Sequence, residues 1–146
     1  MNMPPIVIEA TKFVWDRHPT VTWTWPVALG WTHWHLSMGY MAIARDNNVD
    51  NNIMGVAVIR PVADPGDGII AYEHDEDGPC LFIDFFACDD PIAYPLLAEA
   101  FARRFGPRES VAYFRGFESA LRVKPYERFK RRVSGRLNEE PFLEAE

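Results

Sequence analysis

The sequence predicts an α+β domain in which a twisted, mostly antiparallel sheet is flanked by helices on both faces. Two observations indicate this fold class. Apolar residues recur at spacings of three and four in residues 27–38 and 96–105, which is typical of helices covering one side of a core. Between these ranges lie apolar, β-branched runs separated by Asn, Asp and Gly, which are typical of strands and turns.

Each element can be placed on the chain in turn. Residues 6–17 begin with a short extended run and continue as a helix, which Pro19 ends. Residues 20–26 alternate polar and bulky side chains, as an extended segment does. Pro26 then suits the first turn of a second helix.

The middle of the chain predicts strands. Residues 40–46 and 53–62 form a hairpin around the Asn/Asp-rich loop 47–52. Residues 69–78 predict a short strand and an acidic turn. Residues 79–90 predict a central strand, because they are apolar on both faces up to Cys88, with Asp84 as the one interruption.

The last third predicts a helix, a strand and a second helix. The first of these helices ends at Gly106, and its apolar stripe is formed by Leu96, Leu97, Ala100, Phe101 and Phe105. A strand over 110–117 and a basic helix over 123–135 follow. Residues 1–137 are therefore expected to form one domain, and the acidic residues 138–146 a tail.

Composition limits the class of partner. The net charge of −6 argues against nonspecific nucleic-acid binding. No apolar run approaches the roughly 20 residues that span a bilayer, so no membrane contact is expected. Cys80 and Cys88 form no disulfide framework, and the N-terminal residues lack the pattern of a secretion signal. We therefore expect a cytoplasmic protein. Basic side chains concentrate in residues 103–136 and could contact a small anion.

The order of elements and several motifs resemble the GNAT family of N-acetyltransferases. The hairpin with Gly55 is similar to the family's hairpin, and LFIDFFACDDPIAYPLLAEAFARRF is similar to its central strand, phosphate loop and helix. VAYFRGF and KPYERFKRR resemble the family's C-terminal strand and helix. The resemblance covers roughly residues 6–133 and implies a GNAT-like acyltransferase that moves an acetyl group from acetyl-CoA to an amine.

The resemblance also implies site residues. Asp84 would be the general base, and Tyr126 would be the acid that protonates the departing thiolate. The backbone at the start of the helix would contact the phosphates, helped by arginines. The implied cofactor-binding residues are Phe86, Ala87, Cys88, Ala93, Tyr94, Leu96, Arg103 and Arg104. Structural alternatives are an ion pair of Asp84 with Arg60 or Arg115, or an outward position at a sheet edge, and a core position for Tyr126.

The phosphate loop departs from the family pattern. The family has a leading Gln or Arg and two small positions, where this sequence has Cys88, Pro91 and Ala93. Pro91 has no N–H to donate. Asp89 and Asp90 place negative charge where a pyrophosphate would lie, and such carboxylates are favoured at a helix N-terminus. A pseudoenzyme is therefore the alternative: a non-catalytic structural or protein-interaction module, for example in a multi-subunit or viral assembly.

Further patterns indicate possible contacts. In the alternative, residues 22–26 and 32–35 would present aromatic side chains at an interface, either in a homo-oligomer or with a protein partner. The acidic loop 72–79 could meet a basic group or remain a solvated turn. His33 and His35 lie two apart on a predicted helix and would point in different directions, so no metal site is predicted.

Overall fold

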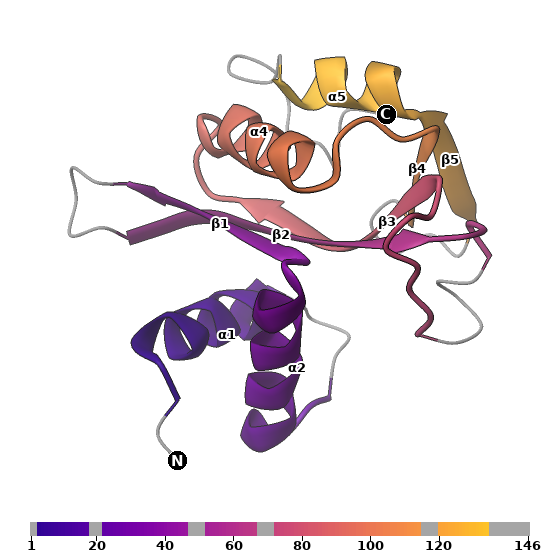
Figure 1. The fold of residues 1–146 in the computed structure, drawn as a ribbon. Coiled ribbons are helices and arrows are strands. Elements are labelled where there is room, and N and C mark those ends of the chain that lie inside the picture. Colours follow the sequence, from indigo (N-terminus) through magenta and orange to yellow (C-terminus); the bar gives the residue numbers. More distant parts are fainter. Residues whose placement is uncertain (1–2, 18–21, 47–51, 67–71, 115–119, 135–146) are drawn as a thin grey trace.

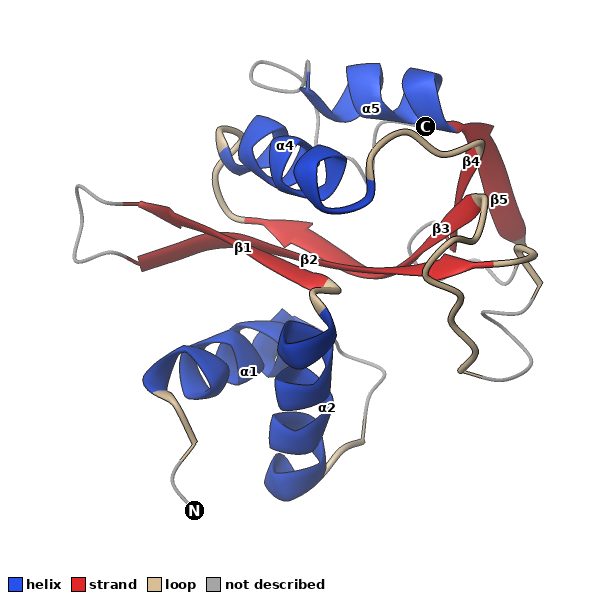
Figure 2. Ribbon diagram, in the orientation of Figure 1, coloured by secondary structure: helices blue, strands red, loops and turns tan. Residues whose placement is uncertain are grey.

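The computed structural model describes residues 3–17, 22–46, 52–66, 72–114 and 120–134. A five-stranded sheet lies between two pairs of helices (Figure 1). Helices α1 (Pro5–Arg17) and α2 (Trp25–Met38) cover one face, and α4 (Ala93–Phe105) and α5 (Tyr126–Ser134) cover the other (Figure 2). The predicted α+β class is confirmed, with a mostly antiparallel sheet and helices on both faces.

The strands follow one another across the sheet in chain order, and β3 is central. Every neighbouring pair is antiparallel except β3 and β4, which are parallel. The predicted central strand and hairpin are thus confirmed. The strands are β1 (Met41–Asp46), β2 (Asn52–Val62), β3 (Cys80–Cys88), β4 (Ser110–Phe114) and β5 (Leu121–Pro125).

The parallel pair is short. Only Cys80–Phe82 of β3 pair with Ser110–Ala112 of β4. Beyond Phe82, β3 continues for six residues with β2 as its ladder partner. The two parallel strands therefore share hydrogen bonds only near their N-terminal ends.

A β-bulge interrupts β3 at its centre. Val58 of β2 lies opposite Phe85, and the next residue, Ile59, lies opposite Ile83, so Asp84 is left without an opposite residue. Ile83 packs in the core beneath α4 and α5, whereas Phe85 packs against α1. The bulge lets Asp84 project on the α2 side of the sheet, where its bonding partners lie.

The ends of α2 follow from its sequence. Pro26 occupies the first turn, where a missing N–H removes no helical hydrogen bond. Gly39 closes the helix in the left-handed conformation, with φ of 76°. Arg104 of α4 donates to the carbonyl oxygen of Met38 at 2.9 Å, so the C-terminal ends of α2 and α4 meet at the sheet edge.

Several predicted elements need correction. Residues 6–9 belong to helix α1, not to an extended run. Within the predicted strand 69–78, residues 72–78 form a loop and turn, and 67–71 lie outside the described residues. Strand β5 was not predicted, and α5 begins only at Tyr126. Leu96 and Ala100 are exposed, so the buried face of α4 is instead Ala93, Tyr94, Leu97, Phe101 and Phe105. Pro19, Arg115 and residues 138–146 also lie outside the described residues.

Candidate functional site

Asp84 forms a buried ion pair with Arg60. Arg60 Nε and Nη2 donate to the two carboxylate oxygens at 2.7 and 2.9 Å. The third guanidinium nitrogen, Nη1, donates to the carbonyl oxygen of Glu73 at 2.6 Å. The Arg60 side chain is 0% exposed and that of Asp84 is 11% exposed. The structural alternative foreseen for Asp84, an ion pair with Arg60, is what the fold contains.

Two aromatic side chains extend this pair toward α2. The Tyr72 hydroxyl is 3.0 Å from Asp84 Oδ2, and the Tyr72 ring lies over the Arg60 guanidinium, 3.5 Å from its carbon. His35 Nε2 contacts the same hydroxyl, and His35 Nδ1 is 2.7 Å from the carbonyl oxygen of Trp31. His35, Tyr72, Asp84 and Arg60 therefore form one chain of polar contacts, which we call the inner network.

Burial shifts the ionisation of the inner network. Desolvation lowers the pKa of His35 to about 4, with the charge of Arg60 acting in the same direction. Desolvation, and then the Asp84 charge, raise the pKa of Tyr72. The pKa of Asp84 is raised by desolvation, against the opposing effect of Arg60. A phenol with a raised pKa is a poor nucleophile at neutral pH.

The acidic loop is fastened beside the inner network. The Tyr40 hydroxyl contacts His74 Nδ1 at 2.9 Å and Glu76 Oε2 at 3.0 Å. Glu76 also pairs with Arg104, and the N–H of Asp75 donates to the carbonyl oxygen of Pro61. Burial, followed by Glu76, raises the pKa of Tyr40 to about 12. Residues 72–78 are thus anchored to β2 and α4, although most of them are exposed.

The first amide groups of α4 are already bonded within the loop that precedes the helix. Asp90 Oδ1 accepts from the N–H of Ile92 at 3.0 Å. The carbonyl oxygen of Asp90 accepts from Ala93 at 3.0 Å, and that of Pro91 accepts from Tyr94 at 3.2 Å. Pro95 has no N–H. Each amide between residues 92 and 95 is therefore bonded or absent.

Asp89 takes no part in these hydrogen bonds. Its carboxylate forms a bidentate contact with Arg17 of α1, at 3.1 and 2.5 Å. Burial, then the charges of Asp89 and Asp90, raise the pKa of the neighbouring Cys88 thiol to about 12. A Cβ atom at Gly55 would lie 2.9 Å from Cβ of Ala93, so glycine allows the start of α4 to approach β2 closely.

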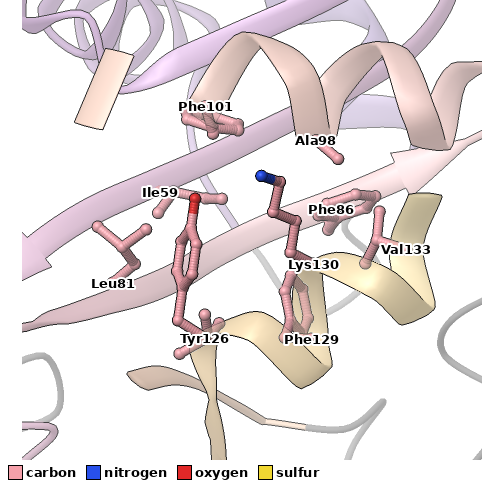
Figure 3. A pocket seen from close by; sticks show the side chains of 10 residues that line it. Ile59, Leu81, Phe86, Ala98, Phe101, Tyr126, Phe129, Lys130 and Val133 are labelled. Atoms are coloured by element: carbon pink, nitrogen blue, oxygen red, sulfur yellow. The ribbon is translucent and has the colours of Figure 1, made fainter. Parts of the chain in front are cut away.

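The two predicted catalytic residues lie on opposite faces of the sheet. Asp84 bonds to groups on the α2 side, whereas Tyr126 is buried in the core beneath α4. The Tyr126 hydroxyl and the Lys130 side chain both point toward α4, at an otherwise apolar cavity of about 30 Å³ between α4, α5 and the sheet (Figure 3). Desolvation raises the pKa of Tyr126.

The predicted cofactor-binding residues are similarly dispersed. Phe86 is buried and stacks on Tyr94, and Leu96 is exposed. Arg103 pairs with Glu99 within α4. Arg103 and Arg104 stand at the C-terminal end of α4, about 15 Å along the helix from Ala93. The arginines and the first amides of α4 therefore do not meet at one point, while Phe86, Ala87, Cys88 and Ala93 remain close to the loop.

The described ranges contain neither a metal-ligand cluster nor a helix that could span a membrane. No group of three or more His, Cys, Asp or Glu side chains there is placed to hold a metal ion. His33 is exposed and His35 is buried, as their spacing on a helix requires. Among the helices described, none has the length and apolar character needed to cross a bilayer.

Comparison with known proteins gives no relative: no family model, curated protein or solved structure matches this chain. The arrangement of the site therefore stands on the structure alone. Sequence reasoning did not identify the contact of His35 with Tyr72. The two residues are 37 positions apart and joined through a loop, and no local pattern marks such a pair.

Proposed function

We propose that this chain is a non-catalytic protein-interaction module built on a GNAT-like scaffold. The observation that carries the proposal is the state of the α4 amides: Ile92, Ala93 and Tyr94 donate to Asp90 and Pro91, and Pro95 has no N–H. A diphosphate bound at a helix N-terminus depends on free N–H groups there. In this chain the protein's own carboxylate and carbonyl oxygens accept the hydrogen bonds that a diphosphate would otherwise accept.

The charge before α4 and the size of the cavity also oppose cofactor binding. Asp90, whose carboxylate accepts from the Ile92 N–H, would meet a diphosphate at the start of α4 with like charge, whereas Asp89 is paired with Arg17. The cavity beside Tyr126 has about 30 Å³, which accommodates one or two water molecules but no pantetheine arm. A pantetheine arm placed in this cavity would have to displace its packed lining side chains.

An aromatic surface on α1 and α2 supports the interaction role. Trp15 is 38% exposed and stacks on Trp25, with ring centroids 5.0 Å apart. Val27, two residues further on, is 55% exposed. Exposed tryptophans of this kind are enriched at the centres of protein interfaces. Trp31 and Trp34 contribute less, because they pack on His35 within the protein.

One observation favours a second candidate, the GNAT-like acyltransferase with acetyl-CoA as donor and an amine as acceptor. Strands β3 and β4 pair over three residues only, and Tyr126 lies beneath α4 with its hydroxyl at the cavity. In the family resemblance, the acyl-CoA arm lies between these two strands. In this candidate Tyr126 protonates the departing thiolate, while Asp84, held by Arg60 on the other face, cannot reach the same reacting centre directly.

A thermal-shift measurement with acetyl-CoA separates the two candidates. We expect no change in Tm at about 1 mM acetyl-CoA, because the α4 amides are bonded within the protein. A site with Kd near 10 µM would instead add about 2.7 kcal/mol, which corresponds to a rise in Tm of roughly 5 to 10 °C in a chain of this length.

The control is the same titration with the variant Arg17→Ala. This substitution releases Asp89 from its ion pair and leaves the bonds of Asp90 unchanged, so it should also give no ligand-dependent shift. A saturable rise in Tm of the natural protein would instead assign it to the acyltransferase candidate.

A further inference from the structure

The Tyr72 hydroxyl lies between two groups that the fold holds in place. On one side is the imidazole of His35, on α2, and on the other is the carboxylate of Asp84, on β3. Tyr72 itself comes from the loop between β2 and β3. One hydroxyl therefore fastens this loop to a helix and to the central strand at the same time.

The proton on the imidazole can be placed from its neighbours. His35 Nδ1 lies 2.7 Å from the carbonyl oxygen of Trp31, and a carbonyl oxygen only accepts hydrogen bonds. Nδ1 therefore carries a proton. In a neutral imidazole Nε2 then carries none, and it turns a lone pair toward the Tyr72 oxygen.

The Tyr72 hydroxyl has one proton too few to hydrogen-bond both His35 and Asp84. Asp84, held as a carboxylate by two bonds from Arg60, is also an acceptor toward Tyr72. The phenol has one proton, so it can donate to His35 or to Asp84 but not to both. The Trp31 side chain also hydrogen-bonds Tyr72, but an indole only donates, so the shortage remains.

One added proton satisfies every contact. An imidazolium donates from Nε2 to the Tyr72 oxygen, and the Tyr72 proton then goes to Asp84. We propose that the closed His35–Tyr72–Asp84 chain takes up a solvent proton at His35, so that acidification tightens the hold of Tyr72 on α2 and β3. At neutral pH one of the two contacts joins two lone pairs, and Tyr72 is held less firmly.

The ionisable groups around His35 set the pH range in which His35 takes up the proton. Arg60 faces it from β2, Asp84 from β3 and Tyr72 from the loop. His74 and Glu76 belong to the same loop but bond to Tyr40. Burial and Arg60 lower the pKa of His35 to about 4, and the bond to Trp31 opposes them. Proton uptake at His35, and the tighter hold of Tyr72 that goes with it, is therefore expected to be centred near pH 4.

An NMR titration of the His35 ring tests this coupling. The pKa of His35 should be higher in the natural protein than in Tyr72→Phe by about one to two units, the size expected for a hydrogen bond to a charged group. The phenylalanine ring retains the packing over Arg60, so the fold should persist, as near-UV circular dichroism would verify. The exposed His33 on the same helix gives a reference signal that the substitution should leave unchanged at any one pH.

Amide hydrogen exchange gives a second readout in the loop. The N–H groups of Asp75 and Gly78 donate to Pro61 and Asp75 within the anchored segment. Their protection, corrected for the intrinsic rate, should rise as the pH falls from about 6 to below about 4 in the natural protein and stay constant in Tyr72→Phe. An equal His35 pKa in both proteins, or a His35 that stays neutral while Asp84 takes the proton, would overturn the proposal.

Discussion

Replacing Asp84 with alanine should lower the free energy of unfolding by about 3 to 5 kcal/mol. The substitution leaves the Arg60 guanidinium, which is 0% exposed, without the carboxylate that accepts two of its hydrogen bonds. A buried charge that loses its partner retains its full desolvation penalty. Urea unfolding followed by circular dichroism, with equal m-values for the two proteins, would measure the loss.

Asp89→Ala is the matched control for this experiment. It removes the same side chain from an ion pair with arginine, but the pair with Arg17 is largely exposed to water. We therefore expect a loss below about 1 kcal/mol. Similar losses for Asp84→Ala and Asp89→Ala would show that the Arg60 pair is not a buried anchor of the sheet.

Leu97→Ala on α4 should lower the free energy of unfolding by about 2 to 5 kcal/mol. Leu97 is 1% exposed and packs in the core beneath α4 and α5. Its neighbour Leu96 is 45% exposed, so Leu96→Ala should change stability by no more than about 0.5 kcal/mol. Equal losses for the two leucines would mean that α4 is rotated about its axis relative to the structure described.

The pair Leu96 and Leu97 also shows what the sequence can specify. Hydrophobic periodicity identifies α4 and its end at Gly106. It does not fix the rotation of the helix, because Tyr94, Leu96, Leu97, Ala98 and Ala100 extend apolar character around most of its surface. The buried set at positions 93, 97, 101 and 105 is selected by the sheet beneath it. Strand β5 was missed because its five residues end in Pro125 and lack an apolar run.

The candidate site was predictable in part. Asp84 stood out as the one acidic residue in an apolar strand, and Arg60 was foreseen as an alternative partner. The β-bulge that aims Asp84 toward α2 depends on the register of two strands and leaves no local signal in the sequence. The hydrogen bond from the Ile92 N–H to Asp90 lies in the turn before α4, where the sequence suggested a carboxylate, since carboxylates are favoured before a helix.

The central claim is that the amides opening α4 are bonded within the protein and unavailable to a diphosphate. An NMR titration of the ¹⁵N-labelled chain with coenzyme A tests it directly, at the amides of Ile92, Ala93, Tyr94 and Leu96. Because three of these groups already donate to Asp90 or Pro91, we expect their chemical shifts to stay constant through millimolar ligand. Saturable shifts of these amides would contradict the claim and show that the loop opens to bind the cofactor.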